Sequence, residues 1–205
     1  MIKLFVFDLG NVILPFDHRQ IGRRLWDTSG KKDTLSVGEI FTTLFSREDG
    51  LVNAYETGCM TSAQFFDQLR GLFALDLGFE EFKGIWNPIF RENARVTEAI
   101  AYLKAKGYPL FLLSDTNELH FTYVRERYPV VEAFDAWILS FEVGAKKPEK
   151  KIYDAIFARM AVDPGEVFYI DDIERYVEAA RGYGIQGTVF RDEESLWRTL
   201  GEMGV

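Results

Sequence analysis

Four short polar segments follow apolar runs in this sequence. They are Asp8, the segment SDTN at 114–117, the segment GAKKP at 144–148 and the pair Asp171–Asp172. Brought together, they could transfer a phosphoryl group, because that chemistry needs a nucleophile, a metal held by oxygen ligands, and donors or cations around the phosphate oxygens. Each segment alone could equally cap a turn, start a helix or lie on the surface. All four in this order are a stronger signal of a site.

The apolar runs before these segments have the lengths of buried strands. These runs span residues 2–7, 108–114, 136–140, 166–171 and 187–190. Stretches with the spacing of helices, such as 96–107 and 148–160, lie between them. Strands alternating with helices predict an α/β fold with a Rossmann-like, parallel five-stranded sheet. Gly107 is expected to stop the first of these helices, and Pro148 to occupy the first position of the second. Ligands of such sheets bind beyond the carboxyl ends of the strands, where the polar segments stand.

Residues 16–94 break this alternation. They show no convincing strand, only amphipathic helical patterns such as those at 61–73 and 78–90. Thr61 or Ser62 is a suitable N-cap for the first of these. About eighty residues far exceed one connection between parallel strands, which disfavours ordinary crossover helices. We therefore expect an inserted all-helical cap domain at 16–94 and an α/β core domain made of 1–15 and 95–205.

Composition limits the possible partners. The 205 residues are 47% hydrophobic and 27% charged, as in ordinary globular proteins. Twenty-four basic and 32 acidic side chains give a net charge of −8, which argues against nucleic acid or an anionic membrane as partner. A single cysteine, Cys59, excludes an internal disulfide framework and a cysteine-rich zinc site. Neither a signal peptide nor a membrane-spanning run is recognisable, so we expect a cytoplasmic location. The oligomeric state cannot be read from the sequence.

The four segments together resemble those of the haloacid dehalogenase-like (HAD) hydrolase superfamily, across essentially the whole chain. The matching stretches are FDLGNVI, LLSDTN, GAKKPEKKIY and FYIDDIERYVEAA. The sequence is most similar to the branch with a helical cap between the first and second core strands, especially its sugar-phosphate and glucose-1-phosphate phosphatases. The stretch AYETGCMTSAQFF also resembles that branch. The resemblance implies a Mg²⁺-dependent phosphatase that hydrolyses a small phosphorylated metabolite through an aspartyl-phosphate.

Asp8 and the acidic pair have the chemistry of a nucleophile and a magnesium site. A carboxylate such as Asp8 can form an aspartyl-phosphate that water later hydrolyses. Mg²⁺ prefers oxygen ligands, and Asp8, the carbonyl of Gly10 and Asp172 would supply three. Asp171 is then expected behind these ligands, or sharing a metal-bound water. A dication would also relieve the repulsion between adjacent carboxylates.

The remaining segments would bind the phosphate group. Ser114 would donate its hydroxyl, and the backbone amides of Leu9 and Asp115 could add donors. Lys147 would neutralise the phosphoryl charge and orient the nucleophile. Lys146 is the alternative lysine, but Lys147 directly precedes a proline, which is the spacing in the family.

Gly10 is the main departure from the family pattern. Most phosphatases of the superfamily carry a second aspartate there, two residues after the nucleophile, as general acid and base. A positioned proton donor contributes about 10²–10⁴-fold, so its loss should slow the hydrolysis of esters with poor leaving groups. The branch with DLGNV shares this glycine. Asp17 and His18 are candidate substitute donors, although a solvated surface pair is the commoner interpretation.

Two further departures affect the phosphate-binding residues. Asp115 stands where this branch more often has asparagine, and a carboxylate near a phosphate is unfavourable unless it points away or is protonated. Tyr176 stands where asparagine or aspartate commonly follows the acidic pair, which could leave Lys147 less firmly oriented. Two alternatives stay open, the first because it would also use Asp8 and the second because of these departures. One is a metal-independent haloacid dehalogenase, and the other a catalytically weak phosphate-binding or interaction module.

Substrate choice in capped members falls to cap residues that face the core. Trp26, Tyr55, Trp86 and Phe90 are candidates to line that cavity. Aromatic residues at helical spacing are, however, more often part of a cap's own hydrophobic core.

Overall fold

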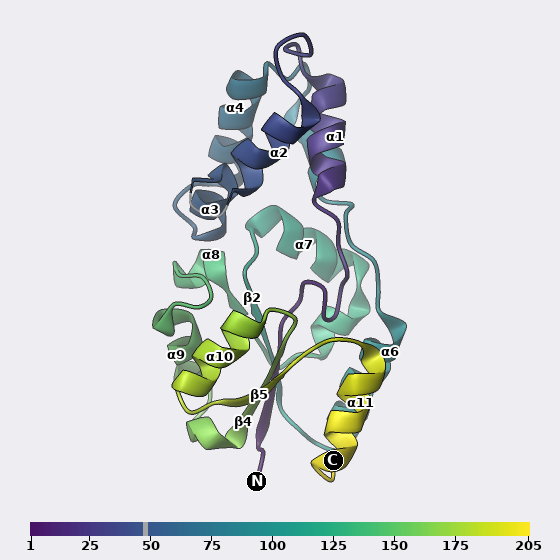
Figure 1. The fold of residues 1–205 in the computed structure, drawn as a ribbon, viewed down its shortest axis with the longest axis vertical. Coiled ribbons are helices and arrows are strands. Elements are labelled where there is room, and N and C mark those ends of the chain that lie inside the picture. Colours follow the sequence, from purple (N-terminus) through teal and green to yellow (C-terminus); the bar gives the residue numbers. More distant parts are fainter. Residues whose placement is uncertain (47–48) are drawn as a thin grey trace.

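The core of the protein is a parallel sheet. The computed structural model describes residues 1–46 and 49–205, and its strands lie in the order β3-β2-β1-β4-β5 (Figure 1). All neighbouring strands pair in parallel. The predicted five-stranded α/β core is confirmed. The strands are β1 (Leu4–Phe7), β2 (Leu110–Ser114), β3 (Ala136–Leu139), β4 (Val167–Asp171) and β5 (Gln186–Val189).

The helices fall into two sets in Figure 1. Those above the sheet are α1 (Arg19–Thr28), α2 (Val37–Phe45), α3 (Leu51–Glu56), α4 (Ser62–Phe73) and α5 (Phe79–Trp86). Those around the sheet are α6 (Ala94–Ala105), α7 (Glu118–Arg127), α8 (Ser140–Val143), α9 (Lys150–Arg159), α10 (Glu174–Gly182) and α11 (Glu193–Glu202), with short 3₁₀ turns η1 (Pro129–Ala133) and η2 (Pro164–Glu166).

Strand β1 is apolar throughout because both of its faces are buried. Phe5 and Phe7 belong to the hydrophobic cluster that α6, α7 and α11 share with the sheet. Leu4 and Val6 point to the opposite face, into the cluster that holds the buried residues of α9 and α10. The uninterrupted apolar run of the sequence thus follows from helices on both sides of the sheet.

Strand order reverses beside β1. The chain continues from β1 to β2 and β3 on one side, and then adds β4 and β5 on the other. Phe7 pairs with Leu112 of β2 and with Ile170 of β4. The residues that follow these strands therefore meet at the reversal point, which is where open α/β sheets bind their ligands.

The upper helices form a hydrophobic cluster of their own, which includes Ile21, Phe65 and Trp86. They join the core through a neck of two adjacent segments, where Phe16 bridges to Phe90 and the Arg91 amide donates to the Pro15 carbonyl at 2.8 Å. Over the described residues of 16–94 there are isolated bridges but no strand. We therefore propose the neck as the boundary of the cap domain, with 16–94 as cap and 1–15 plus 95–205 as core.

Local sequence signals explain several helix ends. Thr61 caps α4, accepting from the Gln64 amide, and Gly107 ends the α6 region with φ +84°. Helix α5 stops at Trp86, short of the expected end of the pattern at 90, because Pro88 cannot continue it. Pro148 at the first helical position was a wrong prediction.

Helix α9 begins at Lys150 instead, since its N-cap Glu149 is still extended, with ψ 136°. No helix in the described part of the chain is long and apolar enough to cross a membrane.

Candidate active site

Asp8 lies at the bottom of a hollow between the cap and the core, directly after β1. Its amide donates to the Ile170 carbonyl of β4 at 2.9 Å, which continues the sheet pairing up to the site. The residue is only 6% exposed. Its Oδ1 accepts a hydrogen bond from Lys147 Nζ at 2.7 Å. The two residues that sequence analysis assigned to nucleophile and charge partner are therefore in direct contact.

Lys147 joins two carboxylates. Its Nζ also donates to Oδ2 of Asp171 at 2.7 Å, and it lies 5.1 Å from the ring centre of Tyr176. Burial alone would lower the pKa of Lys147, but Asp8 and Asp171 outweigh it and raise that pKa well above its usual range. The expectation that Tyr176 leaves this lysine loosely oriented is wrong, because two carboxylates and an aromatic ring hold it.

Lys146 points elsewhere. Its Nζ forms an ion pair with Glu56 of α3 and donates to Oδ1 of Asn53 at 3.1 Å. It thus binds the cap, while Lys147 binds Asp8. These contacts favour Lys147 over Lys146 as the lysine beside the proposed nucleophile, and its catalytic role stays a prediction.

The two acidic residues at the end of β4 differ in how many of their oxygens accept hydrogen bonds. Asp171 is completely buried, and its Oδ2 accepts from Lys147 and from the hydroxyl of Tyr169. Its Oδ1 accepts from the Ile173 amide at 2.8 Å. Asp172 is half-buried and accepts a hydrogen bond from the Asn11 side chain.

Asp8, Asp171 and Asp172 have the arrangement of a metal site. Each offers a carboxylate oxygen, and the three oxygens lie within 4.8 Å of one another. Burial, with Asp171 and Asp172 nearby, raises the pKa of Asp8 well above its usual range, although Lys147 opposes the rise. One lysine against three carboxylates leaves an excess of negative charge. An oxygen-binding dication such as Mg²⁺ fits both the donor set and this charge.

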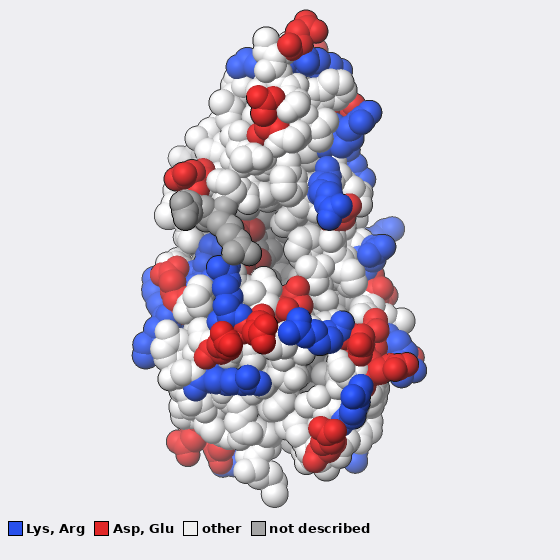
Figure 2. Space-filling view, viewed as in Figure 1, with Lys and Arg blue, Asp and Glu red and all other residues white. Residues whose placement is uncertain are grey.

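The hollow holds two adjoining cavities. The inner one, of about 190 Å³, is lined by Asp8 and Gly10 from the core and by His18 and Glu56 from the cap. The outer one, of about 490 Å³, shares His18, Glu56 and both lysines, and adds Arg175. Figure 2 shows the hollow between the cap above and the core below. A substrate with its phosphate at Asp8 would place the rest of the molecule against the cap.

Ser114 and Asp115 lie beside Lys147. Ser114 ends β2 next to β1 and is 2% exposed, but it is not among the described residues that line either cavity. Asp115 lines the inner cavity, and its Oδ1 accepts from the Lys147 amide at 3.0 Å. Burial raises its pKa. Their contacts with a phosphate stay predictions.

His18 faces the hollow, which corrects its interpretation as a solvated surface residue. Its ring stacks on Phe45 with centres 4.4 Å apart and lies 4.5 Å from the ring of Phe16. Burial lowers the pKa of His18 to about 4, so the imidazole is neutral near pH 7. Asp17 is exposed, as expected.

The four cap aromatics do not line the cavities. Tyr55 and Trp86 are buried in the cap cluster, with Phe90 packed against it. The Trp26 Nε1 donates to the Leu35 carbonyl at 2.7 Å, in a separate outer groove. The commoner interpretation, that these aromatics form cap core, holds for Tyr55 and Trp86.

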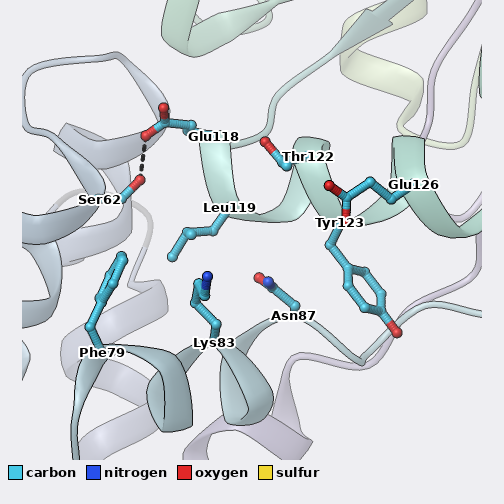
Figure 3. A pocket seen from close by; sticks show the side chains of 9 residues that line it. All are labelled: Ser62, Phe79, Lys83, Asn87, Glu118, Leu119, Thr122, Tyr123 and Glu126. Atoms are coloured by element: carbon cyan, nitrogen blue, oxygen red, sulfur yellow. Dashed lines mark hydrogen bonds between the residues drawn. The ribbon is translucent and has the colours of Figure 1, made fainter.

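A seam of polar contacts also fixes the cap on α7. Ser62 of the cap donates to Glu118 of α7 (Figure 3) and is 2.7 Å from the hydroxyl of Tyr55. That hydroxyl also accepts from the Leu119 amide at 3.2 Å. Helix α3, which carries Glu56, is thereby tied to the helix that follows the SDTN segment.

Residues 2–184 match the family of haloacid dehalogenase-like hydrolases. The chain belongs to this family. It is 28% identical to the D-ribitol-5-phosphate phosphatase of Bacteroides thetaiotaomicron, over 97% of this chain and 96% of that protein. It is 30% identical to the phosphorylated carbohydrates phosphatase of Thermotoga maritima, over 52% of this chain and 50% of that protein.

Solved structures of HAD enzymes have the same fold. One from Bacteroides thetaiotaomicron, in complex with magnesium and inorganic phosphate, has 27% identity and a TM-score of 0.80 and covers 93% of this chain and 95% of that one. The predicted membership of the HAD hydrolases is confirmed.

Two residues of the site went unrecognised in the sequence. Phe16 borders Gly10, and no pattern in the sequence relates the two. Glu56 lies in the stretch AYETG, whose resemblance to the family was the only signal that could have pointed to it.

Proposed function

We propose that this HAD hydrolase is a Mg²⁺-dependent phosphatase that hydrolyses a small phosphorylated metabolite through an aspartyl-phosphate on Asp8. The observation that carries the proposal is the contact of Asp8 with Lys147 at the base of a hollow that holds three clustered carboxylates. The names of the two relatives favour a polyol or sugar phosphate as substrate. The single cysteine, Cys59, suits a cytoplasmic location, which remains part of the proposal.

The reaction has two transfers. A carboxylate oxygen of Asp8 forms a bond to phosphorus while the bond from phosphorus to the substrate alcohol breaks. A water oxygen then attacks the same phosphorus, which releases inorganic phosphate and restores the carboxylate. Lys147 contributes a fixed positive charge beside the phosphoryl group in both transfers, where charge stabilisation matters most. The Ser114 hydroxyl and the backbone amides of Leu9 and Asp115 complete the proposed phosphate contacts.

Asp8, the Gly10 carbonyl and Asp172 would hold Mg²⁺. When bound, the ion supplies positive charge for the phosphate oxygens and for the carboxylates around it. Asp171 is the weaker candidate for direct ligation, since Lys147, Tyr169 and the Ile173 amide already occupy its oxygens. Its role is to position Lys147.

The test is turnover of p-nitrophenyl phosphate by wild type and Asp8→Asn, each with and without Mg²⁺. We expect release of nitrophenolate only from wild type with the ion. Chloride release from a 2-haloacid without metal would instead indicate a dehalogenase. Phosphate binding without turnover would indicate a binding module. A panel of sugar, polyol and other small phosphates then defines the substrate.

A further inference from the structure

At residue 10, where the family pattern has its general acid, this chain offers no proton donor for the leaving group. Gly10 has no side chain, and Phe16 occupies the space beside it. Among the described residues of the two cavities, the cap contributes one carboxylate, Glu56. It lines both the inner cavity with Asp8 and the outer one, so it borders the space into which the substrate alcohol would leave.

We infer that Glu56 is the general acid that protonates the leaving group, supplied by the cap in place of the missing aspartate at residue 10. The inference rests on the proposed phosphatase function. It explains how a chain with Gly10 could hydrolyse esters whose alkoxide is a poor leaving group.

Three contacts hold Glu56 over the hollow. Its carboxylate pairs with Lys146 of the core, so cap and core are joined at this point. The turn after α3 lies so close to α8 that a β-carbon on Gly58 would come within 2.2 Å of the Phe141 carbonyl oxygen. On the other side, Tyr55 is anchored on the seam with α7. Glu56 itself is 8% exposed.

The surroundings favour a carboxyl that can carry a proton. Burial raises the pKa of Glu56, with Lys146 as the main opposing charge. The other charged groups that face it are Asp115, which raises the pKa, and Lys147, which lowers it. His18, in the same cavities, is neutral near pH 7. An incoming phosphate dianion would raise the pKa of Glu56 further, because like charge disfavours the carboxylate.

The proton is accounted for through both transfers. As the bond from phosphorus to the leaving oxygen breaks, the Glu56 O–H gives its proton to that oxygen, and the resulting carboxylate is stabilised by the Lys146 ammonium. In the second transfer the carboxylate accepts a proton from the attacking water, which regenerates the acid. Other acids fit less well. His18, with a pKa of about 4, is neutral near pH 7, and a neutral imidazole is a very weak acid. Asp17 is not among the described residues that line the cavities.

The experiment compares Glu56→Gln with wild type on p-nitrophenyl phosphate and on the best alkyl phosphate of the panel. The value of kcat/KM reports the steps up to the aspartyl-phosphate. Loss of a general acid should lower it for the alkyl ester by about 10²–10⁴-fold. It should fall at least tenfold less for the aryl ester, whose phenolate barely needs the proton. Glu142→Gln removes the same charge from an exposed position on α8 and is the matched control. It should leave the ratio of kcat/KM for the alkyl ester to kcat/KM for the aryl ester unchanged.

Lys146→Met separates an acid from a mere cap contact. Without Lys146 the pKa of Glu56 rises, so the fall of alkyl kcat/KM at high pH should move to higher pH, whereas Glu56→Gln should remove that limb. If Glu56 only fastens the cap, each variant should instead lower kcat/KM for the alkyl and the aryl ester by equal factors. The pH dependence of kcat/KM should then not shift. That result would overturn the inference, and so would a wild type that cleaves only aryl esters. Absence of any turnover by wild type would overturn the phosphatase proposal itself.

Discussion

Phe16 fills the space that a side chain at residue 10 would need. A β-carbon on Gly10 would lie 2.5 Å from Cε1 of the Phe16 ring, much closer than real contacts allow. Gly10 does not have a positive φ, so the obstacle to a larger residue is this ring and not the backbone. Phe16 is held in turn by the rings of His18 and Phe90. The Phe16 ring, packed at the neck, therefore stands in the way of the usual aspartate at residue 10.

Gly10→Asp alone should destabilise the protein, because overpacking costs about 1–3 kcal/mol. Gly10→Asp with Phe16→Ala removes the clash, and should recover a general acid at residue 10. In a Glu56→Gln background the pair should raise kcat/KM for alkyl phosphates more than for aryl phosphates. Thermal unfolding of each variant, with Phe16→Ala as control, gives the stability. If the pair is as unstable as Gly10→Asp alone, the ring is not the obstacle.

Asp8→Asn should abolish turnover of every phosphate ester while the fold is kept. The amide has nearly the same volume and still accepts from Lys147, but it is not a nucleophile. Circular dichroism checks the fold, and nitrophenolate release checks the activity. A variant with near-normal turnover would exclude covalent catalysis at Asp8.

The sequence was a good guide to the parts of the site that strands position. Asp8 and Asp171 follow apolar runs, and parallel pairing alone brings the ends of β1 and β4 together. The family resemblance added Lys147, which comes from a loop. The role of Phe16 and the orientation of Lys146 could not be predicted, because they depend on how the cap packs on the core, and only the family resemblance of AYETG could have pointed to Glu56. Tyr176 was misjudged for a different reason: it and Lys147 both lie in the core, where the tyrosine ring contacts the lysine across a distance in sequence that no local pattern reveals.

Asp172→Asn should raise the Mg²⁺ concentration needed for half-maximal activity, since it removes one of the proposed ligand charges. Asp171→Asn should act differently. It leaves Lys147 and Tyr169 facing an amide in a fully buried place, and breaking a buried pair of this kind costs about 3–5 kcal/mol. Two measurements distinguish the variants: the activity as a function of Mg²⁺ concentration, and the temperature of thermal unfolding. An unchanged metal requirement in Asp172→Asn would move the ligand role to Asp171.

His120 should make stability depend on pH. Burial lowers its pKa from 6.5 to about 3, while its ring nitrogens contact the Asn117 side chain and the Trp86 carbonyl. As the pH falls, the unfolded chain takes up a proton on His120 before the folded protein does. The stability that neutral His120 contributes is therefore fully present above about pH 7 and is progressively lost as the pH falls from there toward 3. The loss from pH 7 to pH 5 is on the order of 2 kcal/mol.

Urea unfolding of wild type and His120→Gln at the two pH values measures this contribution. The difference in unfolding free energy between pH 7 and pH 5 should be smaller in the variant. An equal difference in both proteins would mean that His120 does not carry the effect.

The most direct measurement of covalent catalysis is rapid-quench mass spectrometry of the protein mixed with p-nitrophenyl phosphate and Mg²⁺. Acid quenching within the first turnovers should trap one phosphoryl group per chain, and peptide mapping should place it on Asp8. Asp8→Asn should show none. Nitrophenolate release by wild type with no phosphoryl group on Asp8 at any quench time, or with the group on another residue, would contradict an aspartyl-phosphate at this site.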